Sequence, residues 1–170
     1  MHVGVMAIVR RTSFGLEVQA MGAYTGPADN AELRLLRVGS TNIVSVEAER
    51  GHDRVAHLLI QSGGSLIPTV IEGASEDRCG ATAEIVLRHI EESPRPDGWT
   101  VRVVRTATLE ERPDVLLVRE HLTVHELDRR NPDERIRARH DADAIRRLVP
   151  VGGRLRSDRA PLDVNEIVRR

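Results

Sequence analysis

The chain has 170 residues, a formal net charge of −1 and 25 strong bases, all of them arginine. This length fits one compact domain with a sizeable core. The core must be aliphatic, because the only aromatic residues are Phe14, Tyr24 and Trp99. So few rings argue against a carbohydrate cleft or a stacking surface for single-stranded nucleic acid. Without lysine there is no Schiff-base residue, whereas arginine can still bind carboxylates and phosphates bidentately.

The first seventy residues predict a largely antiparallel sheet. Segments with alternating or β-branched apolar residues are separated by short turns that contain glycine or serine, a pattern typical of hairpins. Pro68 in the last segment indicates an edge strand or a bulge. The six predicted strands cover residues 3–11, 14–21, 31–38, 41–49, 54–60 and 65–72.

A packed helix is predicted next, over about residues 76–92. Ser75 can cap it, and the acidic pair Glu76 and Asp77 suits the positive end of a helix dipole. The stretch "SPRPDG" would end the helix, and a strand is predicted to follow over residues 99–107. The apolar stripe of the helix would consist of Ala83, Val86, Leu87 and Ile90.

Histidines four residues apart, His121 and His125, lie in the segment 114–127. On a helix they would be neighbours able to share a metal ion, but on a strand they would be about 13 Å apart. The alternation of polar and apolar residues favours a strand. His52 and His57 form a second cluster, so a metal site that combines all four histidines is the candidate behind an enzymatic alternative.

Residues 129–159 contain ten arginines and five acidic residues. Asn131 and Pro132 predict the start of a helix over about residues 132–148, followed by a tail with a small apolar set. The arginines suit three uses: a solvated face, docking to a protein, or contact with nucleic-acid phosphates. The residues expected to bind a partner are Arg135, Arg139, Arg146, Arg147, Arg154, Arg156, Leu162, Val164 and Ile167.

Several classes of site are not expected. The single cysteine, Cys79, allows no internal disulfide and no cysteine-based zinc site. There is no P-loop, dinucleotide-binding fingerprint or nucleophile elbow, so no cofactor is predicted. No signal peptide or long apolar segment is evident, and we expect a cytoplasmic protein that does not contact a membrane.

The sequence therefore predicts an α+β fold with a mainly antiparallel sheet of about seven or eight strands. The body would span residues 1–128, and an arginine-rich helix and docking tail would span residues 129–170. The leading hypothesis is a non-enzymatic assembly protein, a subunit of a multi-protein complex such as a phage-like or other prokaryotic particle. Its arm would dock on a neighbouring subunit or a second copy. The alternatives are a small histidine-dependent enzyme, possibly metal-assisted, and a nucleic-acid-binding module that uses the arginine-rich helix.

Overall fold

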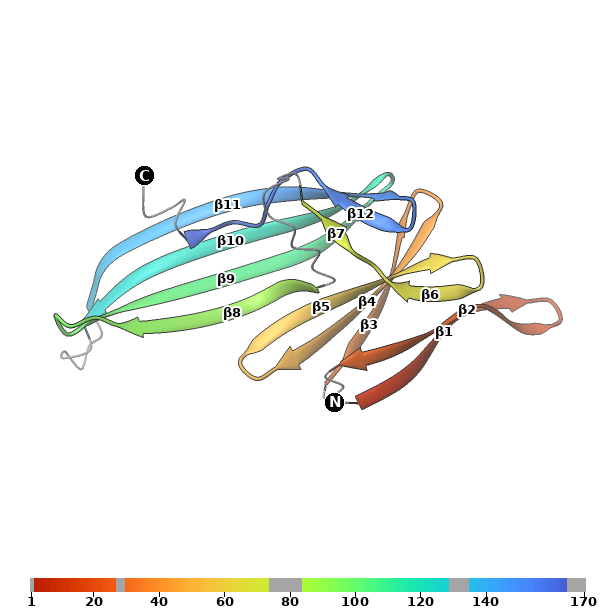
Figure 1. Cartoon of the computed structure of the whole chain (residues 1–170), viewed down its shortest axis with the longest axis horizontal. Coiled ribbons are helices and arrows are strands. Elements are labelled where there is room, and N and C mark those ends of the chain that lie inside the picture. The colour runs from red at the N-terminus through yellow and green to blue at the C-terminus, as the bar shows by residue number, and fades with distance from the viewer. Residues whose placement is uncertain (1, 27–29, 74–83, 129–134, 165–170) are drawn as a thin grey trace.

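A computed structural model describes residues 2–26, 30–73, 84–128 and 135–164, and these residues form a nearly all-β structure (Figure 1). Twelve strands join in one hydrogen-bonded sheet. In chain order they are β1 (His2–Thr12), β2 (Gly15–Gly26), β3 (Glu32–Val38), β4 (Thr41–Arg50), β5 (Asp53–Ser62), β6 (Ser65–Pro68), β7 (Ile71–Glu72), β8 (Glu84–Pro94), β9 (Trp99–Arg112), β10 (Val115–Asp128), β11 (Arg135–Val151) and β12 (Arg154–Ser157).

The predicted strands of the first seventy residues are confirmed, with one division. β1 to β5 form antiparallel hairpins near the expected positions. The last predicted strand, 65–72, is interrupted after Pro68 and becomes the two short strands β6 and β7. The strands predicted at 99–107 and 114–127 are also confirmed, as β9 and β10.

The α+β prediction is wrong, because both predicted helices are strands where the structure describes them. Positions 84–92 of the predicted 76–92 helix lie in β8, and positions 135–148 of the predicted 132–148 helix lie in β11. The remaining positions, 76–83 and 132–134, lie outside the described residues.

Long-range pairing explains both errors. β8 is hydrogen-bonded to β5 on one edge and to β9 on the other, which overrides its helical spacing of apolar residues. In β11, Ala144 and Leu148 are buried while Asp143 and Arg147 are exposed, so the true period is two. That period was hidden because alanine and aspartate are poor strand formers and the buried Arg146 interrupts the apolar face.

Strand β5 is the point at which the sheet divides. One edge pairs along its length with β4. On the other edge, residues 54–57 pair with β8 and residues 59–62 pair with β6. The chain leaves β6 through Thr69 and Val70 and enters β7, which pairs in parallel with β12 at the far end of the strand order. Residues 65–72 therefore link the middle of the sheet to its end.

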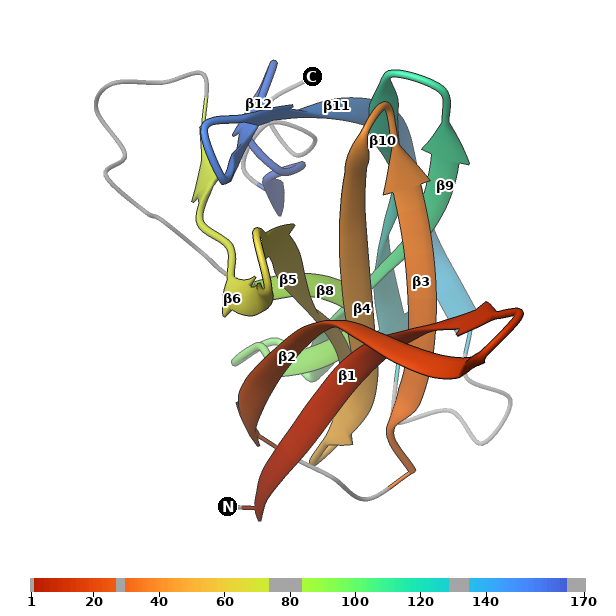
Figure 2. The ribbon, with the colours of Figure 1, turned by 90° about the vertical axis from the view of Figure 1, so that its right-hand side faces the viewer.

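The core is aliphatic, as the composition predicted. Side chains from β3, β4, β5 and from β7 to β12 meet in one buried cluster that contains Ile43, Leu58, Leu116 and Leu148. A second cluster lies beneath the β1–β2 hairpin, where Ile8 and the ring of Tyr24 join apolar residues of β4, β5 and β6. Figure 2 views the molecule from this side, with the hairpin crossing in front of β3 and β4.

A glycine sets how closely the hairpin approaches the body. Gly22 of β2 lies against Leu66 of β6, and a Cβ atom added at Gly22 would stand 2.6 Å from Cβ of Leu66 and closer still to its carbonyl oxygen. The only ladder contact between β2 and β6 pairs Met21 with Ser65, and the Met21 amide donates to Gly64 O at 3.0 Å. The absence of a side chain at Gly22 therefore allows the hairpin to dock.

We predict that Gly22→Ala destabilises the protein by about 1–3 kcal/mol, because the new methyl group meets the backbone of β6 and forces the hairpin away. Gly4→Ala is the matched control, since nothing lies within 4 Å of a Cβ atom added there. Urea unfolding gives the free energies, and limited proteolysis reports on the hairpin. Equal stability of the two variants would contradict the close contact at Gly22.

Candidate functional site

The four candidate histidines do not converge. His57 lies in β5, whereas His121 and His125 lie in β10, three strands away in the order β5-β8-β9-β10. Neighbouring strands are about 4.8 Å apart, so roughly 14 Å separates β5 from β10. His52 lies in the turn between β4 and β5. Within the described ranges no group of three or more His, Cys, Asp or Glu side chains is placed to hold a metal ion.

His121 belongs to a polar network across β10 and β11. Its Nδ1 atom lies 2.8 Å from Asp143 Oδ1, and its Nε2 atom lies 3.0 Å from the hydroxyl of Thr123. A hydroxyl, imidazole and carboxylate in this order resemble a catalytic triad. The Thr123 hydroxyl, however, donates its proton to Asp141 at 2.8 Å. The network therefore pairs two strands and does not present an activated nucleophile.

Asp141 is the electrostatic centre of this network. Two hydrogen bonds lower the pKa of the Asp141 carboxyl: the bond from Arg139 has the larger effect and the bond from Thr123 the next largest. Arg139 and Asp141 are two residues apart on one strand, with Nε and Oδ2 at 2.8 Å. On the predicted 132–148 helix, Arg139 with Asp143 and Arg137 with Asp141 would be i,i+4 pairs. On the strand, Arg137 instead lies 3.8 Å from Glu126 and over the ring of Trp99.

His57 is a half-buried histidine beneath the hairpin. Its ring meets Tyr24 edge-on, with 5.5 Å between centroids. The Nε2 atom has no hydrogen-bond partner and lies 3.7 Å from Glu84. Burial lowers the pKa of His57, against a smaller opposing effect of the Glu84 carboxylate. The His57 ring therefore packs at the margin of the core, and no group of possible metal ligands forms around it among the described residues.

The C-terminal tail docks on the protein's own sheet. Arg146 Nη2 and Glu120 Oε1 form a buried ion pair at 3.0 Å. The second oxygen of Glu120 accepts a hydrogen bond from the Leu162 amide at 3.2 Å, and Arg105 donates to the Leu162 carbonyl at 2.9 Å. Leu162 fills an apolar cluster with residues of β9, β10 and β11, and Val164 packs against it. Glu120 and Arg105 therefore bind the tail on the face of β9, β10 and β11 that carries this apolar cluster, and Arg146 holds Glu120 in place.

In the described part of the chain, the side chains of the other arginines expected to bind a partner do not take part in holding the tail. Arg154 pairs with Glu72 at 2.7 Å. Arg147 and Arg156 are exposed and make no side-chain ion pair or hydrogen bond within the described residues. The side chain of Arg135 and the whole of Ile167 lie outside what the structure describes.

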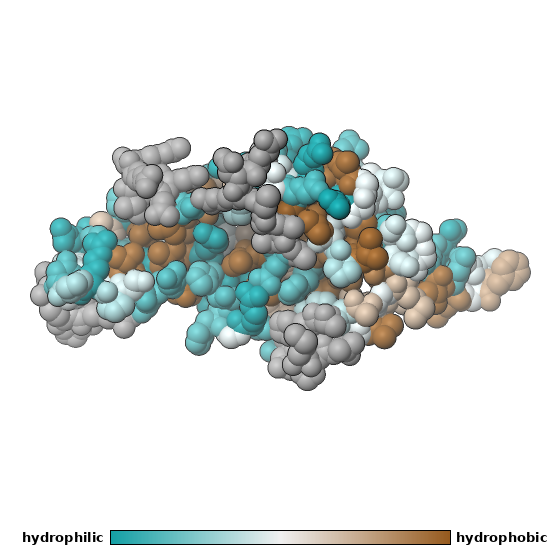
Figure 3. All heavy atoms as spheres, in the orientation of Figure 1, coloured by the Kyte–Doolittle hydropathy of each residue, from teal (hydrophilic) through white to brown (hydrophobic). Residues whose placement is uncertain are grey.

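An exposed apolar surface that the sequence analysis did not select lies on the β1–β2 hairpin. Phe14 at its tip is fully exposed, Leu16 is 78% exposed and Val5 is 73% exposed. Figure 3 shows apolar side chains on this protruding element at the right of the molecule. Large apolar residues also exposed on the hairpin are Val9, Val18 and Met21.

The outer edge of β1 is unpaired within the described structure, because β1 stands at the end of the strand order and pairs only with β2. Residues 3–9, "VGVMAIV", contain no ionisable side chain. Natural proteins usually protect such edges with charges, prolines or very short strands. The uncharged run is the signal from which this surface could have been predicted.

Comparison with known protein families, with curated protein sequences and with solved structures found no match. Among the described residues, no helix has the length and apolar character needed to cross a membrane. The functional argument therefore rests on the surfaces of the chain itself.

We predict that Arg146→Met destabilises the protein by about 3–5 kcal/mol, because it leaves the Glu120 carboxylate buried without its partner. Glu120→Gln keeps an acceptor for the Leu162 amide and is expected to cost less. The double variant Arg146→Met/Glu120→Gln removes the unpaired charge and should recover part of the loss. Urea unfolding measures the three free energies. A double variant less stable than Arg146→Met would contradict the role of an unpaired carboxylate.

The His57 environment predicts a dependence of stability on pH. The pKa of His57 is lowered in the folded protein, so the unfolded chain takes up this proton at higher pH. Stability should therefore fall as the pH is lowered through the ordinary histidine pKa of about 6.5. His57→Gln should reduce that loss in urea unfolding at about pH 7.5 and pH 5.5. His140→Gln, at an exposed position, is the control and should behave like the wild type.

Proposed function

We propose that the protein is a non-enzymatic assembly subunit that associates with a second copy of itself through the free edge of β1. The observation that carries this proposal is the uncharged stretch of residues 3–9 on an unpaired edge of a hairpin with an apolar outer face. Two such edges related by a two-fold axis would continue both hairpins into one four-stranded antiparallel sheet.

The edge is compatible with its own copy. If Met6 lies on the two-fold axis, Val5 of one copy stands opposite Ala7 of the other, and both are exposed on the outer face. The nearest arginines, Arg10 and Arg11, then lie beyond the paired residues. No charged side chains are brought together, so this register avoids the repulsion that like charges opposite each other would cause.

Two other edges of the described sheet are protected. β3 pairs only with β4 and carries Glu32, Arg34 and Arg37 at exposed positions. β7, at the opposite end of the order from β1, has only two residues. Charges and short length are the usual means of blocking edge-to-edge pairing. Residues 3–9 of β1 have neither charges nor the short length of β7, which supports a role for this part of the edge in association.

The two alternatives from the sequence have less support. A nucleic-acid-binding module was predicted on an arginine-rich helix, but the described part of that segment is β11. The enzymatic alternative required histidines that converge, and they are divided between β5 and β10. We propose the cytoplasm, or a particle assembled there, as the site of action, since a single cysteine suits a reducing compartment.

The test is light scattering during size-exclusion chromatography of the full chain over a wide range of concentration. We expect the wild type to self-associate and the variant Val5→Lys/Ala7→Lys to be monomeric, because it places lysines opposite each other across the two-fold axis. Val151→Lys is the control, since Val151 is an exposed apolar residue near the β11–β12 turn.

Hydrogen exchange supplies a second measurement. Self-pairing protects β1 backbone amides that face solvent in the monomer, so these amides should exchange more slowly in the wild type than in Val5→Lys/Ala7→Lys. A wild type that is monomeric at every concentration would refute the proposal. So would a Val5→Lys/Ala7→Lys variant that associates as strongly as Val151→Lys.

A further inference from the structure

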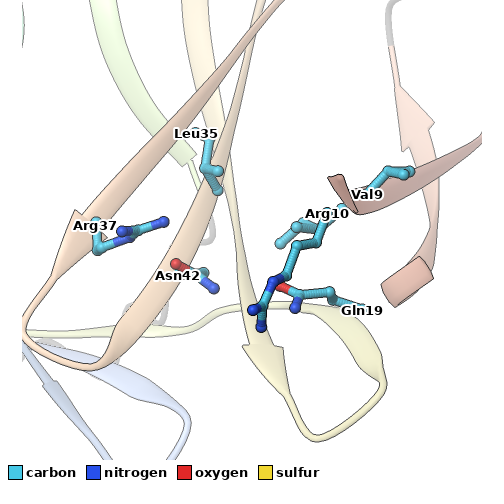
Figure 4. Close-up of a pocket in the computed structure, with 7 residues that line it drawn as sticks. Val9, Arg10, Gln19, Leu35, Arg37 and Asn42 are labelled. Atoms are coloured by element: carbon cyan, nitrogen blue, oxygen red, sulfur yellow. The ribbon is translucent and has the colours of Figure 1, made fainter. Parts of the chain in front are cut away.

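A pocket of about 420 Å³ lies between the β1–β2 hairpin and the β3–β4 hairpin (Figure 4). Its apolar wall consists of Ile8, Val9 and Leu35. Its polar lining comes from all four strands and consists of Arg10, Gln19, Arg37 and Asn42. The volume is within the range of sites for small organic ligands.

Two unpaired guanidinium groups flank this pocket. Arg10 and Arg37 make no ion pair or hydrogen bond with any described residue. The strand register places Glu17 opposite Arg10, yet the two side chains form no ion pair. Elsewhere on the same body, Arg34 and Arg54 both pair with Glu47. Two like charges around one hollow repel each other unless an anion lies between them.

One amide of the pocket is fixed by a hydrogen bond, and the other lies at a bulge. The Asn42 side-chain nitrogen donates to Gln61 Oε1 at 2.6 Å, which fixes its orientation on β4. Gln19 is the extra residue of a β-bulge, because Ile8 pairs with Ala20 and the next residue, Val9, pairs with Val18. Bulges of this kind redirect a side chain and are common beside binding sites. Here the bulge residue lines the pocket.

The lining indicates the class of ligand. Arginine forks match carboxylates and phosphates, and the amides can bind further oxygen atoms. Ile8 is buried and Leu35 is half exposed, so part of the wall suits an apolar group. No aromatic ring lines the pocket to stack on a base or a sugar. We propose that the pocket binds a small organic carboxylate with an aliphatic body, its carboxylate between Arg10 and Arg37 and its body against Leu35.

This proposal goes beyond self-association and does not depend on it, since the pocket is formed within one copy. It can therefore fail while the proposed function holds, and the reverse is also true.

The test is isothermal titration calorimetry of the full chain with hexanoate as the probe. Acetate lacks the aliphatic body, 1-hexanol lacks the charge, and inorganic phosphate is the competing oxyanion. We expect hexanoate to bind about tenfold or more tightly than each of these, because it combines charged hydrogen bonds to the two arginines with burial of an aliphatic body. Phosphate that binds as tightly as hexanoate, or hexanol that does, would overturn the assignment.

Variants locate the site. Arg10→Gln and Arg37→Gln should each weaken hexanoate binding about tenfold. Arg156→Gln is the control, because Arg156 is exposed, unpaired within the described residues and outside the pocket. Both pocket arginines are exposed, so the fold should persist, and circular dichroism confirms it. Absence of hexanoate binding, or binding that the double variant Arg10→Gln/Arg37→Gln leaves unchanged, would refute the proposal.

Discussion

The structure depends on one strand, β5, whose backbone serves three partners. β4 occupies one edge, while β8 and β6 share the other. Every buried amide and carbonyl of a strand needs a partner, so this division decides which parts of the chain can approach. β8 connects β5 to the long strands β9, β10 and β11, and β6 connects β5 to the β1–β2 hairpin. Side chains on both faces of β5 are buried, among them Val55, Ala56 and Leu59. The strand is therefore the common wall of the two main apolar clusters.

How much the sequence could predict follows from the range of the interactions. Local alternation and short turns were enough to predict β1 to β5, and also β9 and β10. The predictions for residues 84–92 and 135–148 were wrong because the strands that pair with them come from distant parts of the chain. Their own residues are compatible with either a helix or a strand. Arg146 shows the same limit of sequence-based prediction. An arginine within a strand is expected to face solvent. Here it is buried because Glu120, on the neighbouring strand, supplies the opposite charge.

The candidate sites show the same limit. The apolar residues Leu162 and Val164 led to the prediction of a tail that docks on a neighbouring subunit or a second copy, whereas in the structure they pack on the chain's own sheet. The sequence does not indicate which residues form this receiving surface. The receiving surface is made by Arg105, Glu120 and the apolar side chains of three strands. The exposed apolar surface of the β1–β2 hairpin was missed for the opposite reason. An uncharged strand such as residues 3–9 looks like a core strand until the fold shows that nothing covers its edge.

The attachment of the β1–β2 hairpin to the rest of the described structure links its two proposed roles. It touches the body through a single ladder pair beside Gly22 and through the cluster around Tyr24. A ligand between Arg10 and Arg37 would add a third connection between the same two parts. A second copy paired with β1 acts on the opposite edge of the same hairpin. If both partners favour the same orientation of the hairpin, each raises the affinity for the other by the same factor, because coupling between two sites is reciprocal.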